Sequence, residues 1–98
     1  MTFSGGQGLK RRPVLVVYDF GDDDLLVVPV TSHPARTAND AVVSLWQEAG
    51  LKLPSAIRVE KLATIQKSCV ERTLGRLSAG DLAAFKEVLA VIYKRLSP

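Results

Sequence analysis

The sequence predicts a mainly β protein that ends in one α-helix, with a small, strongly bent sheet or partial barrel. Two β-prone apolar runs, at residues 13–20 and 24–32, are separated by a polar link of hairpin length that contains Gly21. After residue 78, apolar residues recur at intervals of three and four, which is the period of an amphipathic helix. A chain of 98 residues has room for a single domain, so residues 1–98 are taken as one unit.

Five segments before the helix are predicted to be strands, and the first two are the hairpin runs. Because Pro29 cannot donate a ladder hydrogen bond, we expect its part of the second strand to lie at an edge or a bulge. The other three strands are expected at residues 41–46, 56–62 and 70–77. Residues 1–10 are rich in glycine and are expected to form a flexible loop.

The C-terminal helix is predicted over residues 78–97. Ser78 and Asp81 resemble a capping box, in which the first side chain accepts a hydrogen bond from a free backbone N–H of the first turn. Lys94 and Arg95 suit the negative end of the helix dipole. One apolar stripe is expected to pack on the sheet or to form a dimer interface, and it consists of Leu82, Phe85, Leu89, Ile92 and Leu96.

Composition excludes several classes of protein. The net charge of +3 permits binding to RNA, DNA or an acidic peptide without requiring it. Cys69 is the only cysteine, so the chain cannot form an internal disulfide or a cysteine-based zinc site. The longest apolar runs are too short to span a bilayer, and the first dozen residues lack the features of a secretion signal. We therefore expect a cytoplasmic protein, and we predict no cofactor.

The hairpin also predicts where two polar side chains meet. Arg12 precedes the first strand and Thr31 ends the second, so an antiparallel pair brings both residues to the same end of the sheet. A guanidinium and a hydroxyl at one place suit a single anionic ligand such as a phosphate.

Six blocks of sequence are informative as an ordered set, although each is weak alone. They are residues 8–17, 29–32, 35–38, 50–55, 57–65 and 74–78. With these blocks the chain resembles the PemK/MazF family of toxin–antitoxin endoribonucleases. The resemblance implies an SH3-like barrel of the CcdB, PemK and MazF type, which works as a homodimer.

The same resemblance implies a function and a partner. Family members are the toxins of type II systems and cleave single-stranded RNA, including mRNA, at short sequences without a metal. The products carry a 2′,3′-cyclic phosphate and a 5′-hydroxyl. Activity is blocked when an acidic segment of the cognate antitoxin occupies the dimer groove.

The resemblance also assigns roles to four residues. Arg12 matches the arginine that contacts the scissile phosphate, and Thr31 matches the threonine that hydrogen-bonds the same group. Arg58 and Glu60, expected on one face of one strand, match an acid and base pair in which relatives have aspartate in place of Glu60. Such cleavage requires a base, an acid and cations that stabilise the phosphorane. Further contacts with RNA are expected from Lys10, Arg11, Ser32 and Arg36.

The N-terminus departs from the family pattern. Relatives begin with a strand of the Gly-Asp-Ile-Trp type, and residues 1–4 resemble the segment that follows it. We therefore expect that strand to be missing, the barrel to be incomplete and a neighbouring edge to be bare. Gly6 and Gln7 stand in a loop where relatives often carry His or Glu. These differences favour weak or absent catalysis.

Several residues have a second interpretation. Arg58 and Glu60 also suit an exposed ion pair, which would be worth under about 1 kcal/mol. His33, the only histidine, suits either acid–base chemistry or a solvated loop, and Trp46 suits either base stacking or the core. Cys69 fits a half-buried structural thiol.

Two other functions fit the same features. A shortened relative without catalysis would bind RNA or an antitoxin in a salt-sensitive way and show no turnover. A relative of the gyrase-poisoning toxins would share the fold, but those proteins act through a helix end that contains tryptophan. This chain instead ends with Lys94-Arg95-Leu96-Ser97-Pro98, which favours the ribonuclease.

Overall fold

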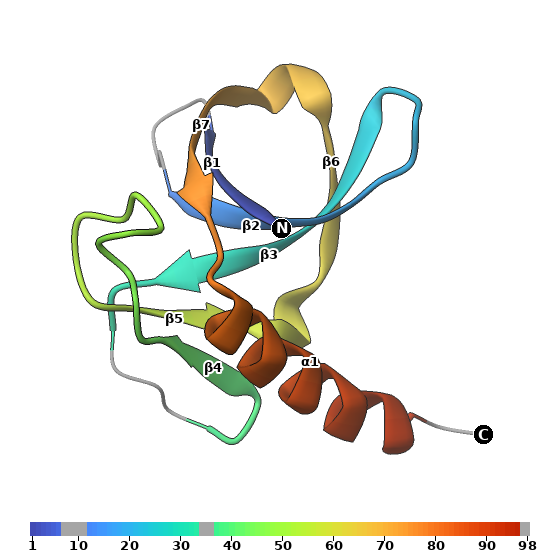
Figure 1. Cartoon of the computed structure of the whole chain (residues 1–98). Helices are drawn as coiled ribbons and strands as arrows, with labels where there is room; N and C mark the ends of the chain where they lie inside the picture. Colours follow the sequence, from blue (N-terminus) through green and yellow to red (C-terminus); the bar gives the residue numbers. More distant parts are fainter. Residues whose placement is uncertain (7–11, 34–36, 97–98) are drawn as a thin grey trace.

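The two apolar runs form the predicted hairpin in the computed structural model, which describes residues 1–6, 12–33 and 37–96 (Figure 1). Strand β2 (Pro13–Asp19) pairs antiparallel with strand β3 (Asp24–Thr31). The link between them is fixed locally, because Asp19 Oδ1 accepts the backbone N–H of Gly21 at 2.8 Å. Gly21 has a φ of 82°, in the left-handed region that glycine adopts without a steric cost.

The described strands form one antiparallel sheet with the order β4-β5-β3-β2-β1-β7, and β6 pairs with β3 off this path. No ladder joins β4 to β7 within the described ranges, so the sheet is bent without closing into a continuous barrel. The remaining elements are β1 (Thr2–Gly6), β4 (Asp40–Val43), β5 (Ser55–Arg58), the 3₁₀ turn η1 (Val59–Lys61), β6 (Ala63–Gln66), the 3₁₀ turn η2 (Lys67–Cys69), β7 (Val70–Arg76) and α1 (Ala79–Lys94).

Strand β3 changes partner along its length. On the side away from β2, its first half pairs with β6, whereas Val30 and Thr31 pair with β5. Pro29 lies between these two ladders, so its missing N–H interrupts neither of them. The expectation that this part of the strand lies at an edge or a bulge was wrong in its strict form, because β3 is a central strand; Pro29 is tolerated because neither ladder on that side includes it. The same change of partner places Thr31 between the hairpin and β5.

The N-terminal residues differ from both expectations stated for them. Residues 2–6 form β1, which pairs with β2 on one side and with β7 on the other. The prediction of a flexible loop over residues 1–10 was therefore wrong for residues 2–6, and residues 7–10 lie outside the described part. The edge of β2 that was expected to be bare is covered. The physical reason is that Phe3 is completely buried, and its burial offsets the weak strand preference of the neighbouring glycines.

Two strand ends and one additional strand also differ from the prediction. The third strand ends at Val43, because residues 44–50 form consecutive turns. The fourth ends at Arg58, after which the chain continues as η1. Strand β6 was not predicted, because its four residues are mostly exposed and carry no apolar alternation.

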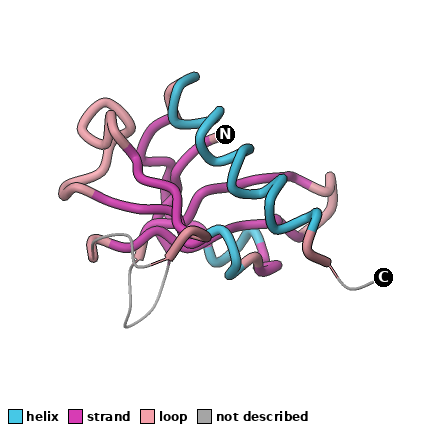
Figure 2. Tube along the Cα trace, turned by 90° about the horizontal axis from the view of Figure 1, so that it is seen from below, coloured by secondary structure: helices cyan, strands magenta, loops and turns pink. Residues whose placement is uncertain are grey.

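Helix α1 confirms the prediction made from its cap and its period, but it ends at Lys94, earlier than the predicted range of 78–97. Ser78 Oγ accepts the backbone N–H of Asp81 at 3.1 Å, and the Asp81 carboxylate accepts the N–H groups of Ser44 and Leu45, each at 3.0 Å. Asp81 therefore joins the first turn of α1 to the chain just after β4. Figure 2 shows α1 running across one side of the strands. Within the described residues, no helix is long and apolar enough to cross a membrane.

The core lies between the bent sheet and α1. Its largest completely buried side chains come from β1, β2, β3, β4, β5, η1 and the helix, and they are Phe3, Leu15, Val28, Val43, Ile57, Val59 and Phe85. Three other residues of the predicted helix stripe, Leu82, Leu89 and Ile92, are partly buried against this core. Leu96, the last residue of the stripe, is exposed.

Candidate functional site

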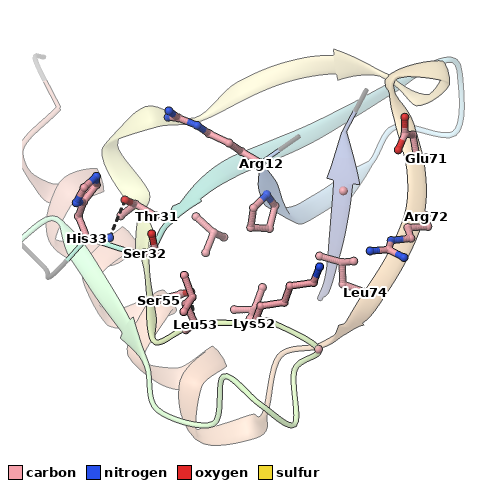
Figure 3. A pocket seen from close by; sticks show the side chains of 15 residues that line it. Arg12, Thr31, Ser32, His33, Lys52, Leu53, Ser55, Glu71, Arg72 and Leu74 are labelled. Carbon is pink, nitrogen blue, oxygen red and sulfur yellow. Dashed lines mark hydrogen bonds between the residues drawn. The ribbon is translucent and has the colours of Figure 1, made fainter. Parts of the chain in front are cut away.

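Arg12 and Thr31 line the same two cavities at one end of the β2–β3 hairpin. The register places Val14 opposite Pro29, so Arg12 and Thr31, two residues further along, reach the same end of the sheet. The larger cavity has a volume of about 610 Å³ and the smaller about 340 Å³. Figure 3 shows the larger one, with Arg12 and Thr31 on its border. The hairpin register therefore brings this cation and this hydroxyl to one space, as the sequence predicted.

Thr31 keeps a hydrogen-bond donor for a ligand. Its Oγ1 accepts the backbone N–H of His33 at 3.1 Å. Because this interaction uses a lone pair of the oxygen, the hydroxyl hydrogen is still able to point into the cavity. Ser32 is exposed and lines the larger cavity next to Thr31.

His33 lies in the same place as Arg12 and Thr31. Its side chain is exposed and lines both cavities, and Figure 3 shows it beside Thr31. The two interpretations given for His33, acid–base chemistry and a solvated loop, both fit this position.

Arg58 reaches the smaller cavity from the end of β5. Arg12, Thr31, Asp40 and Arg58 are among the residues that line it. Arg58 Nε lies 3.8 Å from Oδ1 of Asp40, whose side chain is only 2% exposed. Asp40 therefore faces one side of the guanidinium from within the protein at ion-pair distance, without a hydrogen bond between these two atoms, and no pattern in the sequence signals this contact.

Glu60 is placed differently from the expectation that it shares a strand face with Arg58. Strand β5 ends at Arg58, and Glu60 belongs to η1. The two side chains still meet, because Arg58 Nη2 lies 3.7 Å from Glu60 Oε1. Asn39 Nδ2 donates a hydrogen bond to the other carboxylate oxygen at 3.2 Å. Glu60 lines neither cavity, so a partly exposed ion pair describes its present contacts.

The opposite wall of the larger cavity carries two more cations. Lys52 lies in the segment between β4 and β5, and Arg72 lies on β7 together with the acidic Glu71. Neither Lys52 nor Arg72 was predicted to be a site residue from the sequence. Among the described residues that line this cavity, Arg12, Lys52 and Arg72 are positively charged. Glu71 is the one acidic residue among them.

A close backbone contact holds that wall together. A Cβ atom on Gly50 would overlap the carbonyl group of Leu74, and one on Gly75 would overlap the carbonyl group of Ala49. The two chain segments therefore touch only because both positions are glycine. This contact fixes Lys52, two residues after Gly50, relative to β7.

The remaining sequence predictions have mixed outcomes. Lys10, Arg11 and Arg36, expected to bind RNA, lie outside the described residues. Trp46 is partly buried against the core, which supports a packing role. Cys69 is exposed in η2, so the expectation of a half-buried thiol was wrong.

The arrangement suits an anionic ligand that approaches an open surface. Arginine grips two oxygens of a phosphate at once, and the Thr31 hydroxyl is able to donate to the same group. The described residues contain no group of three or more His, Cys, Asp or Glu side chains that would hold a metal ion.

Comparison with known proteins matches residues 2–93 to the family described as PemK-like, MazF-like toxin of type II toxin-antitoxin system. The chain is 29% identical over 94 residues to Endoribonuclease MazF9 of Mycobacterium tuberculosis, covering 87% of this chain and 80% of the relative.

Solved structures share the fold at lower identity. The Mycobacterium tuberculosis toxin MazF-mt6 superimposes with a TM-score of 0.82 at 22% identity, covering 96% of this chain and 97% of the other. An endoribonuclease in complex with its cognate antitoxin, from a mycobacterial species, superimposes with a TM-score of 0.80 at 15% identity. That match covers 99% of this chain and 95% of the other. The predicted fold of a small MazF-type β structure with a C-terminal helix is confirmed.

Proposed function

Because this chain belongs to the PemK-like, MazF-like toxins of type II toxin–antitoxin systems, we propose that it is an endoribonuclease that cuts single-stranded RNA without a metal. The observation that carries this proposal is that Arg12 and Thr31 line one cavity. A relative at 29% identity is named as an endoribonuclease, which supports the same activity.

In the proposed reaction the ribose 2′-oxygen attacks the adjacent phosphorus, and the bond from phosphorus to the 5′-oxygen breaks. The products are a 2′,3′-cyclic phosphate and a 5′-hydroxyl. Arg12 binds the two non-bridging oxygens, and the Thr31 hydroxyl donates to one of them. Both contacts strengthen as negative charge builds up on the phosphorane, which is how such donors lower a barrier.

Arg58 and Glu60 supply the proposed acid and base. The Glu60 carboxylate takes the proton of the 2′-hydroxyl, and Arg58 gives a proton to the leaving 5′-oxygen, which is far more basic than a guanidine. The two groups lie 3.7 Å apart, and the proton returns from Glu60 to the neutral Arg58 after each turnover once they approach to hydrogen-bond distance. For this role Glu60 has to turn from its present contact with Asn39 towards the smaller cavity.

The proposed partners follow from the family. The toxin acts as a homodimer in the cytoplasm, where mRNA is found, and an acidic antitoxin segment blocks the site. A structure described as an endoribonuclease with its cognate antitoxin shares this fold, which supports such a partner. Ser32, Lys10, Arg11 and Arg36 are proposed to contribute further contacts with RNA.

The test is cleavage of a long unstructured RNA by the purified protein in EDTA. We expect fragments that end in a 2′,3′-cyclic phosphate, and no cleavage by Arg12→Ala protein that keeps the wild-type circular dichroism spectrum. Absence of cleavage by folded wild-type protein would contradict the proposal, as would undiminished cleavage by the variant. Binding to RNA without turnover would instead identify the binding module.

A further inference from the structure

We propose that Lys52 and Arg72 form a second phosphate subsite, which binds the phosphodiester of a nucleotide that neighbours the scissile bond. The inference rests on the proposed function for its ligand, because an RNA strand carries one phosphate per nucleotide. A cavity with Arg12 at one border and two further cations on the opposite wall is suited to such a ligand.

The two cations come from different parts of the chain and line the same cavity. Lys52 belongs to the segment between β4 and β5, and Arg72 belongs to β7. In Figure 3 both side chains extend into the space that faces Arg12 and Thr31. The contact of Gly50 with Leu74, and of Gly75 with Ala49, keeps the two segments together. The fold therefore fixes the backbone segments that carry the two cations, and both side chains are exposed.

The charge balance of this wall favours an anion. Lys52 and Arg72 make no ion pair within the described ranges. Glu71 is the one acidic residue among the described lining residues, and Figure 3 shows its carboxylate pointing away from Lys52. Two cations held on one side of a concave surface raise the local concentration of anions and lower the cost of bringing a phosphate there.

The cavity has the size and lining for one nucleotide between its two cationic borders. Its volume of about 610 Å³ lies within the range of about 300–1,000 Å³ that is usual for small-molecule sites. Apolar residues that include Val30, Leu53 and Leu74 also line it. A base or ribose packs on these side chains, while the phosphates on either side reach Arg12 and the Lys52–Arg72 pair.

The experiment measures binding, so that it does not depend on catalysis. A cleavage site is first mapped on a long RNA, and a nonanucleotide centred on it is made with 2′-O-methyl groups, which prevent attack by the 2′-oxygen. Affinity is measured against salt for wild type, for Lys52→Met/Arg72→Met, and for Lys86→Met/Lys94→Met. The last variant removes the same charge from the exposed side of α1 and is the matched control.

We expect the Lys52→Met/Arg72→Met variant to bind about tenfold more weakly, while the control binds like wild type. The slope of log affinity against log salt should fall in magnitude by about 0.7, the value for one phosphate contact on a single strand. One methylphosphonate linkage, next to the scissile position, should weaken wild-type binding and have no effect on the Lys52→Met/Arg72→Met variant.

Two results would overturn the subsite. The first is an RNA affinity of the Lys52→Met/Arg72→Met variant equal to that of the control variant. The second is a loss of affinity in this variant that no single methylphosphonate linkage reproduces in wild type, because such a loss would indicate only long-range attraction. If wild type cleaves no RNA, the proposed function fails, and a degenerate pool of 2′-O-methyl nonanucleotides replaces the mapped one. An unchanged salt slope with that pool would then reject the subsite as well, and a slope reduced by about 0.7 would support it.

Discussion

Arg58 Nε lies 3.8 Å from Oδ1 of Asp40, a carboxylate whose side chain is only 2% exposed. On its other side, Arg58 Nη2 lies 3.7 Å from the partly exposed Glu60. One guanidinium is thus shared between a buried carboxylate and a surface carboxylate. The buried one has little freedom to move, so we expect its charge to influence where the guanidinium lies relative to the smaller cavity.

The first prediction concerns this pair. Asp40→Asn keeps the shape of the side chain but removes its charge, so Arg58 should turn towards Glu60 and away from the cavity. We expect kcat for RNA cleavage to fall about tenfold with little change in KM, because the ground-state contacts of Arg12 remain. The unfolding free energy should fall by about 1–2 kcal/mol in urea titrations.

A double-mutant cycle separates positioning from general damage. If Asp40 acts through Arg58, Asp40→Asn should cause little further loss of kcat in an Arg58→Met background. Equal losses in both backgrounds would show that Asp40 serves only the fold.

The second prediction concerns the hydroxyl of Thr31. Thr31→Val preserves the shape but removes the donor proposed to contact the phosphorane, so kcat should fall by about 10²–10³-fold. Thr31→Ser retains the hydroxyl and should keep most of the activity. Kinetics on one defined oligonucleotide would compare the three proteins. Near wild-type turnover by the valine variant would remove Thr31 from the mechanism.

The parts of the fold that the sequence predicts are those that local interactions determine. A short polar link sets the register of the β2–β3 hairpin, so the order of residues along the chain is enough to predict that Arg12 and Thr31 lie at the same end of the sheet, where they line the same cavities. The helix is equally predictable, because Ser78 and Asp81 form its cap and one apolar stripe follows.

Other parts depend on contacts between distant segments and leave no local signal. The strand at residues 2–6 exists because β2 and β7 pair with its two edges, whereas its own composition favours a loop. Lys52 and Arg72 line one cavity because their backbone segments touch at Gly50 and Gly75. Glu60 was expected on a strand, and the chain forms a 3₁₀ turn there instead.

The third prediction concerns stability and pH. Burial raises the pKa of Asp81, but the hydrogen bonds from the backbone of Leu45 and Ser44 and from Ser78 outweigh it, so the pKa is lowered in the folded state. A lowered pKa means that the carboxylate contributes stability above the unfolded value of about 3.9, and that this contribution is lost as pH falls through the folded value.

Asp81→Asn should therefore lower the unfolding free energy by about 2 kcal/mol at pH 7, since a charged acceptor of two backbone N–H groups is lost. The difference from wild type should shrink below pH 4, which urea titrations at pH 7 and at pH 3 would measure. Glu87→Gln, at an exposed position of α1, is the control. A difference between Asp81→Asn and wild type that does not change with pH would show that the charge is not the source of the stability.

The fourth prediction concerns the glycine contact behind Lys52. Gly50 has a φ of 87°, and a Cβ there would overlap the Leu74 carbonyl, so Gly50→Ala should destabilise the protein by about 2–4 kcal/mol. Gly80 lies in the first turn of α1 with open space around it, so Gly80→Ala should be neutral or stabilise by up to about 1 kcal/mol. Thermal melts of the three proteins make the comparison.

Because the contact also fixes Lys52 relative to β7, the Gly50→Ala protein, below its melting temperature, should show the weakened RNA affinity of the Lys52→Met/Arg72→Met variant. Wild-type affinity in a destabilised Gly50→Ala protein would mean that the contact supports the fold without positioning the cations.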